Sequence, residues 1–406
     1  MKNTLILVFN CGSSSLKFSI LNVYSKKKFL YGVVDFIRKE FISVVWTIGD
    51  LQFKSLLNFN GSYKIVINFI LEEIIFKERY LLSKLIGIGH RVVHGAQYVN
   101  KSVIINKKVL NYIKKACIFS PLHNPINLLC IKIILNKMNL FKKNNVAVFD
   151  TAFHQTIPKK FYLYGIPYFY YKKYSIRKYG AHGISCLYSV RTVSKILNIP
   201  LNKLNVIICH LGNGSSISIV KHGKCLDTSM GLTPLEGLIM GTRSGDIDPS
   251  IVFYMYKKLK MSIESIESIL TKNSGLLGIN GISQNFHYLK KKYYTNKFVK
   301  LSIDMFCARI IKYIGAYFVL NEKKIHALIF TGGIGENVPL VRKIIISKLS
   351  ILGFYIDKSK NNSVVNKNIF INTKNSINIL IIPSNEEYII AEEVLYLINK
   401  YKINVM

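Results

Sequence analysis

Two segments in opposite halves of the chain follow one plan. Residues 5–10 are an apolar run that ends at Asn10, and apolar side chains alternate with polar ones over residues 16–20. Residues 206–209 and 216–220 repeat the run and the alternation. Apolar runs and alternation predict strands, and the Gly- and Ser-rich residues between them predict hairpin turns.

The two turns align residue by residue. Asn10-Cys11-Gly12 corresponds to His210-Leu211-Gly212, and a pair of serines follows in both. This match favours an internal duplication; the alternative is two unrelated hairpins. Strands and helices alternate after each hairpin, which predicts layered α/β structure. A chain of 406 residues exceeds one ordinary core, so we expect two domains.

The pattern predicts further elements at defined places. We expect helices over residues 66–76, 285–313 and 338–349 and from residue 385 onward, and strands over residues 85–92, 146–149 and 327–330.

The formal charge of +35 comes mostly from lysine spread along the whole chain. Nucleic-acid binding is one interpretation, but dedicated binders concentrate their charge in a patch that includes arginine. Drift in an A+T-rich genome explains the excess better, so no nucleic-acid partner is expected. Seven cysteines stand singly, without CxxC or zinc spacing, which fits a reducing compartment. No secretory signal and no apolar run of ~20 residues is present, so we expect a cytoplasmic protein without a membrane partner.

Three polar loops follow apolar runs. Residues 10–17 offer backbone N–H groups, the hydroxyls of Ser13 and Ser15, and the charge of Lys17. Residues 210–216 offer two glycines that permit close approach of the backbone to a ligand. Residues 331–337 precede a predicted helix, where N–H groups can bind phosphate. Each loop alone could be an ordinary turn, whereas all three together predict phosphate binding.

Arginine is scarce in this lysine-rich chain, so its use at Arg91 and Arg243 suggests bidentate recognition of carboxylate or phosphate. The alternative for Arg243 is a structural pair with Asp246 or Asp248. Six histidines lie in Gly or Pro contexts without metal spacing, and we interpret them as donors to phosphate; they are His90, His94, His123, His154, His182 and His210. Asp150 follows a predicted strand, where α/β enzymes place catalytic carboxylates.

Longer strings make the chain similar to the acetate kinase family over nearly its whole length. They are NCGSSSLKF, GHRVVHG, PLHNP, VFDTAFHQTIP, RKYGAHG, HLGNGSS, DTSMGLTPLEGLIMGTRSGDIDP, TGGIGEN and PSNEE. The resemblance implies two duplicated actin-like (ribonuclease H-like) α/β domains with an active-site cleft between them. The N-terminal domain would comprise residues 1–150 plus a C-terminal helix at about 386–406. Residues 151–385 would form the nucleotide-binding domain.

The resemblance also implies roles for individual residues. Asp150, His182 and Arg243 match the catalytic positions, with the last two stabilising the transition state. Arg91 matches the substrate carboxylate site, and Val93, Leu122 and Pro234 match the pocket for the substrate methyl group. Asn10 and Glu386 match the site for Mg²⁺ (or Mn²⁺). The nucleotide contacts would be Lys17, His210, Leu211, Gly212, Asn213, Gly214, Asn285, Phe286, His287, Gly333, Ile334, Gly335, Glu336 and Asn337.

The implied reaction is reversible, direct in-line phosphoryl transfer from ATP to acetate, giving acetyl phosphate and ADP, in a homodimer. Three departures stand out. Asn285 and His287 replace an Asp-x-Arg pattern at the adenosine site, Ile184-Ser185-Cys186 replaces Thr-Ser-His, and Ser215 replaces a common glycine. Alternatives are a propionate or butyrate kinase, with small Ala181 beside His182, and a non-catalytic ATP-dependent clamp. Arg91 and Val93 speak against a clamp, which needs no acid-binding site.

Overall fold

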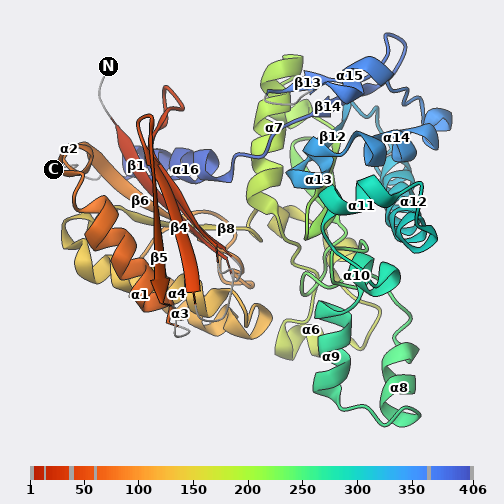
Figure 1. The fold of residues 1–406 in the computed structure, drawn as a ribbon, viewed down its shortest axis with the longest axis horizontal. Helices are drawn as coiled ribbons and strands as arrows, with labels where there is room; N and C mark the ends of the chain where they lie inside the picture. The colour runs from red at the N-terminus through yellow and green to blue at the C-terminus, as the bar shows by residue number, and fades with distance from the viewer. Residues whose placement is uncertain (1–3, 13–14, 36–40, 59–61, 364–366, 403–406) are drawn as a thin grey trace. The chain divides into compact units, whose positions relative to one another are not determined.

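A computed structural model describes residues 4–12, 15–35, 41–58, 62–363 and 367–402. The chain divides into two compact units. The first comprises Met1–Phe153 together with Asn385–Met406, and the second comprises His154–Ser384. The first unit therefore takes its last helix from the opposite end of the chain, which is the blue helix α16 (Glu386–Lys400) among red and orange elements in Figure 1.

In the described part of the first unit, eight strands form one mixed sheet in the order β5-β4-β3-β2-β1-β6-β8-β7. The strands are β1 (Leu5–Cys11), β2 (Ser15–Asn22), β3 (Lys28–Asp35), β4 (Phe41–Ile48), β5 (Leu51–Asn58), β6 (Leu85–Val92), β7 (Val103–Ile104) and β8 (Asn145–Phe149). Strands β1, β6 and β8 run parallel to one another, whereas β1 to β5 form an antiparallel meander.

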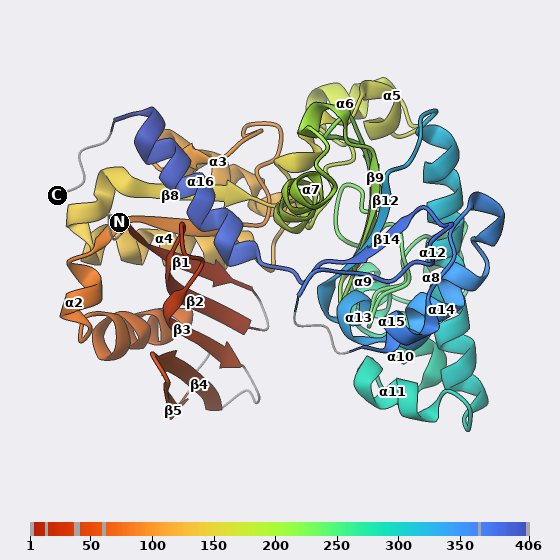
Figure 2. The ribbon, with the colours of Figure 1, turned by 90° about the horizontal axis from the view of Figure 1, so that it is seen from above.

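Helices cover both faces of this sheet. They are α1 (Tyr63–Phe69), α2 (Arg79–Leu82), α3 (Lys107–Lys115), α4 (Asn124–Lys137) and α16, with a π-helical turn at Ile70–Ile75 and 3-10 turns at Ala116–Phe119 and Asn139–Asn144. Side chains of β6 alternate between the faces: Ile88 joins a core with Cys130 and Ile134 of α4, and its neighbours Gly87 and Gly89 meet α16. Figure 2 shows α16 and α4 on either side of the sheet.

Gly87 and Gly89 let α16 approach β6 very closely. A methyl group on Gly89 would lie 2.4 Å from Ile390, and one on Gly87 would lie within 2.8 Å of Val394 and Ile398. The three α16 residues are spaced four apart and form one apolar stripe. Because the stripe fits against the bare backbone of β6, the N-terminus of α16, with Glu386, is held beside the sheet.

In the described part of the second unit, six strands form a sheet in the order β11-β10-β9-β12-β14-β13. The strands are β9 (Val206–Leu211), β10 (Ser215–Lys221), β11 (Lys224–Thr228), β12 (Ala327–Thr331), β13 (Ile369–Phe370) and β14 (Asn378–Ile381). Strands β9, β12 and β14 are parallel, and β9 to β11 are antiparallel neighbours.

The helices of the second unit are α5 (Lys159–Tyr162), α6 (Tyr168–Tyr174), α7 (Gly183–Leu197), α8 (Ser250–Lys257), α9 (Ile263–Lys272), α10 (Gly275–Asn280), α11 (Phe286–Lys292), α12 (Lys297–Leu320), α13 (Gly332–Asn337), α14 (Pro339–Ser347) and α15 (Lys358–Asn362), with 3-10 turns at Leu201–Lys203 and Ser350–Leu352. The core joins the sheet to α12 and α14 through residues such as Leu328, Ile310 and Val341.

The two sheets share one plan, which confirms the predicted fold class of duplicated α/β units. In each, an antiparallel run (β5 to β1 in the first unit, β11 to β9 in the second) lies beside two parallel strands and an antiparallel edge strand. The hairpin positions also correspond. Asn10 pairs with Lys17 next to the first turn, and His210 pairs with Ser216 next to the second. The second turn is one residue shorter, because Cys11 pairs with Leu16 whereas Leu211 pairs with Ser215.

Two elements predicted from the sequence differ in detail from those in the structure. The predicted helix over residues 285–313 is two helices, α11 and α12, separated where the lysine and tyrosine run ends. The glycine-rich residues 332–337 form the short helix α13 rather than an open loop. Ser13, a predicted phosphate donor, lies outside the described residues. No described helix is long and apolar enough to cross a membrane, and the seven cysteines are free thiols.

We expect His90 to make the stability of the first unit depend on pH. Its Nε2 lies 2.8 Å from Oδ1 of Asn145, whose Nδ2 donates to the Phe141 carbonyl, so Nε2 carries the proton. Burial lowers the pKa of His90 from 6.5 to about 4, against a smaller raising effect of the Asn145 bond. Between these values only the unfolded chain binds the proton. The free energy of unfolding should therefore fall as pH drops from 6.5 to 4, by up to about 3 kcal/mol.

The His90→Gln variant is the matched control, because a glutamine amide can donate to Asn145 but does not titrate. Trp46, the single tryptophan of the sequence, lies in this unit, so urea unfolding followed by its fluorescence reports the unit directly. Between pH 6.5 and 4.5 the wild type should lose more stability than His90→Gln; parallel losses would contradict the prediction.

Candidate active site

The carboxyl ends of three parallel strands bring predicted site residues together in the first unit. Asn10 lies near the end of β1, Arg91 near the end of β6, and Asp150 directly after β8. The Asp150 N–H continues the parallel pairing by donating to the Val92 carbonyl at 3.0 Å. Glu386 joins them from the first turn of α16, where a carboxylate interacts favourably with the helix dipole.

Arg91 contacts the side chains of the other three residues. Its Nε and Nη2 donate to Oδ2 of Asp150 at 3.0 and 2.5 Å, and Nη1 donates to Oδ1 of Asn10 at 2.9 Å. Oε2 of Glu386 lies 3.8 Å from Nε of Arg91 and accepts from Nδ2 of Asn10 at 3.1 Å. Burial lowers the pKa of Arg91, but the carboxylates of Asp150 and Glu386 raise it more, so the guanidinium stays charged.

This network leaves part of Arg91 for a ligand. Three of the five N–H donors of a guanidinium are used in the described contacts, and two remain. The Arg91 side chain is 18 % exposed, whereas that of Asp150 is 1 % exposed. Asp150 therefore fixes the plane of Arg91 from inside the unit.

The other predicted residues of the first unit lie around this cluster to different degrees. Lys17 is the cross-strand partner of Asn10, so both side chains project from the same face of the sheet. Val93 is nearly buried just beyond β6, and its N–H donates to Asn127 at 3.2 Å. Leu122 is 57 % exposed on the turn before α4.

The carboxyl edge of the second sheet holds the two remaining glycine-rich segments side by side. The turn 212–214 follows β9, and α13 follows β12. Gly332 has a φ of 77°, and a methyl group there would lie 2.7 Å from the Leu211 carbonyl. Ser215 closes the turn by donating to the Gly212 carbonyl at 2.9 Å, so the serine in place of glycine is a structural element of the turn.

His182, Arg243 and the glycine turn converge. A methyl group on Gly214 would lie 3.5 Å from Nε2 of His182 and 3.6 Å from Nη1 of Arg243. The segment carrying Arg243 is tied to the same turn, because Gly241 N–H donates to the Asn213 carbonyl at 3.0 Å. The structure thus gathers three predicted site segments, far apart in sequence, around one point.

Arg243 is a partly buried cation without a carboxylate partner among the residues that the structure describes. Its Nη1 contacts the Pro234 carbonyl at 3.2 Å and Sδ of Met240 at 3.8 Å, and burial lowers its pKa. The alternative that Arg243 pairs with Asp246 or Asp248 is wrong. Asp246 binds Arg309 and Tyr313, at 3.3 and 2.7 Å. Asp248 accepts from Ser250 N–H at 2.8 Å.

Two histidines of the second unit form a stacked pair. The rings of His182 and His210 lie 4.1 Å apart at 25°. Ser216 Oγ lies 3.0 Å from Nδ1 of His182, and Ser185 Oγ lies 2.9 Å from Nδ1 of His210. The changed Ile184-Ser185-Cys186 segment therefore contacts His210 through Ser185, while Ser216 of the second strand contacts His182.

The interpretation of all six histidines as phosphate donors is wrong for two of them. His90 is 1 % exposed and His154 is completely buried. Burial lowers the pKa of each to about 4, so both rings are neutral parts of the core at neutral pH.

The predicted contacts to the rest of the nucleotide lie on α13 and α11. Gly333 and Asn337 are exposed, whereas Ile334 and Gly335 are buried. Glu336 Oε1 accepts from the N–H groups of Gly332 and Ser384 at 2.8 and 2.9 Å, so this carboxylate holds the backbone together.

The segment that is predicted to contact the adenosine begins with an ordinary helix cap. Asn285 Oδ1 accepts from His287 N–H at 2.8 Å, and asparagine caps a helix as well as aspartate does. His287 is exposed, whereas the ring of Phe286 packs in the core 5.3 Å from Phe306. Only the backbone of Phe286 is left to contact a ligand.

Sequence reasoning missed the residues that orient the site. Ser216 and Ser185 lie inside or beside quoted strings, but their histidine partners are distant in sequence. Tyr164 donates to Oε2 of Glu236 at 2.5 Å and accepts from Leu232 N–H at 2.7 Å, and so holds the segment around Pro234. In the sequence, these contacts are indicated only by the length of the strings that resemble the acetate kinase family.

Oxygen donors in the first unit fit a magnesium ion. Asp150 and Glu386 supply carboxylates and Asn10 an amide oxygen around the same arginine. No group of three or more His, Cys, Asp or Glu able to hold a metal occurs in the described ranges. Mg²⁺ in nucleotide-dependent enzymes needs fewer, because one or two carboxylates, waters and substrate phosphates complete its shell.

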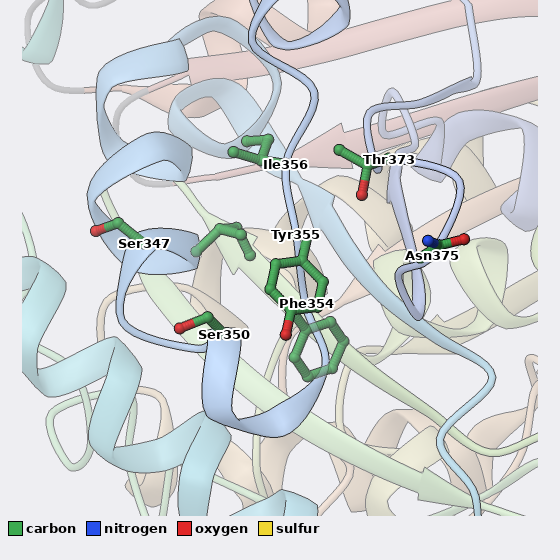
Figure 3. A pocket seen from close by; sticks show the side chains of 8 residues that line it. Ser347, Ser350, Phe354, Tyr355, Ile356, Thr373 and Asn375 are labelled. Atoms are coloured by element: carbon green, nitrogen blue, oxygen red, sulfur yellow. The ribbon is translucent and has the colours of Figure 1, made fainter.

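A hollow of about 500 Å³ lies elsewhere in the second unit, and Figure 3 shows the side chains that line it. It is lined by Ile346, Ser347, Ser350, Phe354, Tyr355, Ile356, Thr373 and Asn375. None of these is a predicted site residue, so the hollow is no part of the candidate site.

The duplicated sheets, with charged and glycine-rich segments at their carboxyl edges, define the class of duplicated actin-like α/β proteins. The model of the acetokinase family matches residues 5–392, and the chain belongs to this family. It is 52% identical to an acetate kinase of Buchnera aphidicola subsp. Baizongia pistaciae over 394 residues, 97% of this chain and 98% of that one.

Solved structures of acetate and propionate kinases are similar to this chain along nearly its whole length. A propionate kinase from Francisella tularensis superposes with a TM-score of 0.89 at 45% identity, covering 96% of this chain and 98% of that one. The Porphyromonas gingivalis acetate kinase superposes with a TM-score of 0.89 at 32% identity, covering 97% of this chain and 100% of that one.

We expect the Arg91–Asp150 pair to behave as a coupled buried ion pair. Asp150→Ala should cost about 3–5 kcal/mol of unfolding free energy, because it leaves the arginine without its main counter-charge. Arg91→Met combined with Asp150→Ala should cost less than Asp150→Ala alone. Urea unfolding followed by Trp46 fluorescence measures both; additive effects in the double-mutant cycle would contradict the coupling.

Proposed function

We propose that this chain is an ATP-dependent kinase that transfers the γ-phosphoryl group reversibly to acetate, giving acetyl phosphate and ADP. Membership of the acetokinase family and the similarity to named acetate kinases support this. The observation that carries the mechanism is Arg243. It is a partly buried cation without a carboxylate partner among the described residues, beside His182 and the glycine turn. An anionic ligand such as a phosphoryl group would supply the missing charge.

Arg91 binds the acid in this proposal. A carboxylate is already ionised at neutral pH, so the reaction needs no strong general base. The two remaining N–H groups of Arg91 would bind the carboxylate, while Asp150 fixes the guanidinium plane and limits rotation of the bound acid. Val93, Leu122 and Pro234 would line the space for the methyl group.

Arg243 and His182 act on the transferred phosphoryl group. Their side chains would donate to its equatorial oxygens, where charge spreads in the transition state. Backbone N–H groups of residues 212–214 and the His210 ring would contact the neighbouring phosphates. Because these groups are fixed before substrate binds, little reorganisation is needed during transfer.

Mg²⁺, or Mn²⁺, would be held by Asn10 and Glu386 with help from Asp150. When bound, the ion neutralises phosphate charge and helps align the two anions. Lys17, projecting from the same face as Asn10, would bind a phosphate oxygen of ATP.

The nucleotide assignment completes the proposal. Gly333, Ile334, Gly335, Glu336 and Asn337 on α13, and Asn285, Phe286 and His287 on α11, would contact ATP largely through the backbone. The first unit is thus proposed as the acid- and metal-binding domain and the second as the nucleotide-binding domain. We further propose a cytoplasmic homodimer, as the family resemblance implies.

A propionate kinase is the second candidate. A propionate kinase is 45% identical to this chain, a value between those of the two acetate kinases compared above. One methylene in an apolar pocket changes discrimination by only about 1–3 kcal/mol, so the acyl pocket decides between the candidates.

Arg243→Ala should lower kcat for acetyl phosphate formation by at least about 10³-fold, because the transition-state charge loses a preorganised donor. The product is trapped as its hydroxamate. Arg79→Ala, which removes an exposed arginine of α2, is the control and should keep full activity. Near-normal activity of Arg243→Ala would contradict the mechanism.

We expect kcat/KM to fall in the order acetate, propionate, butyrate, by about 10-fold or more per methylene. Measuring the three acids with both ATP and GTP also tests whether Asn285 and His287 relax the choice of base. Val93→Ala should raise kcat/KM for propionate relative to acetate. A wild type that prefers propionate would favour the second candidate.

A further inference from the structure

His154 is a buried residue that the proposed reaction leaves without a role. It lies at the start of the second unit, in the 3-10 turn Phe153–Thr156, and is completely buried. Its Nε2 lies 2.8 Å from the Ala181 carbonyl, and its Nδ1 lies 3.2 Å from Sγ of Cys225. A carbonyl oxygen can only accept, so Nε2 carries the proton and Nδ1 faces the thiol.

The ring and the thiol keep these protonation states at neutral pH. Burial lowers the pKa of His154 to about 4, with Lys178 adding to the effect and the Ala181 bond opposing it. Burial also raises the pKa of Cys225 well above its ordinary value. The thiol has two acceptors within reach, Nδ1 of His154 at 3.2 Å and the Asp227 carbonyl at 3.4 Å. The neutral imidazole lies between Cys225 and the backbone at Ala181.

The residue after Ala181 is the catalytic candidate His182, whose backbone is strained. His182 has φ 58° and ψ 24°, in the left-handed region, which is unfavourable for a residue other than glycine. Such a conformation persists only where the surroundings hold it. His154 is the one described donor to the Ala181 carbonyl.

The ring of His154 also packs directly beneath this segment. Gly180 has a φ of 77°, and a methyl group there would lie 2.7 Å from Cδ2 of His154. The N–H groups of Tyr179 and Gly180 both donate to the Gly231 carbonyl, at 3.0 and 3.1 Å. On its other side, His182 is fixed by α7, because Cys186 N–H donates to the His182 carbonyl at 3.0 Å.

We propose that His154 is a positioning residue that fixes the direction of His182 through the Ala181 carbonyl. This inference rests on the proposed function, in which His182 contacts the transferred phosphoryl group. Without the hydrogen bond, the segment 180–182 can rotate, and Nε2 of His182 leaves the point that it shares with Arg243 and Gly214. Substrates should still bind, whereas the transition state loses a fixed donor.

Two substitutions distinguish the contribution of Nε2 of His154 from that of Nδ1. The amide nitrogen of glutamine reaches approximately the position of Nε2, so His154→Gln can still donate to Ala181. The shorter asparagine places its amide near Nδ1, so His154→Asn keeps a polar group beside Cys225 and loses the contact with Ala181. Both variants are neutral and both remove the ring.

His154→Asn should lower kcat by about 10–100-fold, the cost of a misplaced catalytic group, and change KM for acetate and ATP by only a few-fold. His154→Gln should keep kcat within a few-fold of the wild type. Equal kcat values in two variants of equal thermal stability would overturn the proposal. If His154→Asn does not fold, His154→Gln decides alone, because a large loss of kcat in the folded glutamine variant refutes the role of Nε2.

A second readout tests whether His154 acts through His182. In a His182→Ala background, His154→Asn should have no further effect on kcat, because the group that it positions is gone. An undiminished effect in that background would refute the inference. Wild-type activity is measured first: an inactive wild type refutes the proposed function, whereas an active wild type with indistinguishable His154 variants refutes this inference alone.

Discussion

A partly buried guanidinium is stabilised by negative charge nearby, and the two units of this protein differ in whether a carboxylate supplies it. In the first unit Asp150 lies against Arg91 from inside the sheet edge, so the arginine is compensated before any ligand arrives. In the second unit the described contacts of Arg243 are a carbonyl and a thioether. Arg91 is therefore held in one plane with two N–H groups unused in the described contacts. Arg243 keeps a positive charge that, in the proposed function, an anionic ligand would neutralise.

The duplication explains why such different sites share one framework. Each sheet places the second residue before its hairpin turn at a corresponding position, and that residue is Asn10 in one unit and His210 in the other. Beside Asn10 lie carboxylates, which suit a hard cation. Beside His210 lie His182 and the glycine turn, which suit phosphate oxygens. One backbone plan therefore carries carboxylates at one edge and histidines with a glycine turn at the other, and the side chains make the difference.

The parts of this fold that depend on local pattern were predictable from the sequence. Both hairpins, the strand before α13 and the last helix follow from apolar runs, alternation and glycine turns. The contacts that orient the site were not, because they join residues distant in the chain. Nothing in the sequence near Gly87 or Gly89 indicates that Ile390 and Val394 of α16 will pack there. Likewise Asp246, beside Arg243 in sequence, pairs with Arg309 instead.

The histidines show how burial decides a role that residue type leaves open. His154 and His182 both occur in glycine- or proline-rich segments, and both carry the same ring. His154 is completely enclosed and neutral, so it can hold a backbone carbonyl but cannot approach a ligand. His182 stands at the start of α7 in a left-handed conformation that directs Nε2 toward Arg243 and Gly214. The strained backbone of His182 requires support from its surroundings, and the buried ring of His154 supplies it through the hydrogen bond to the Ala181 carbonyl.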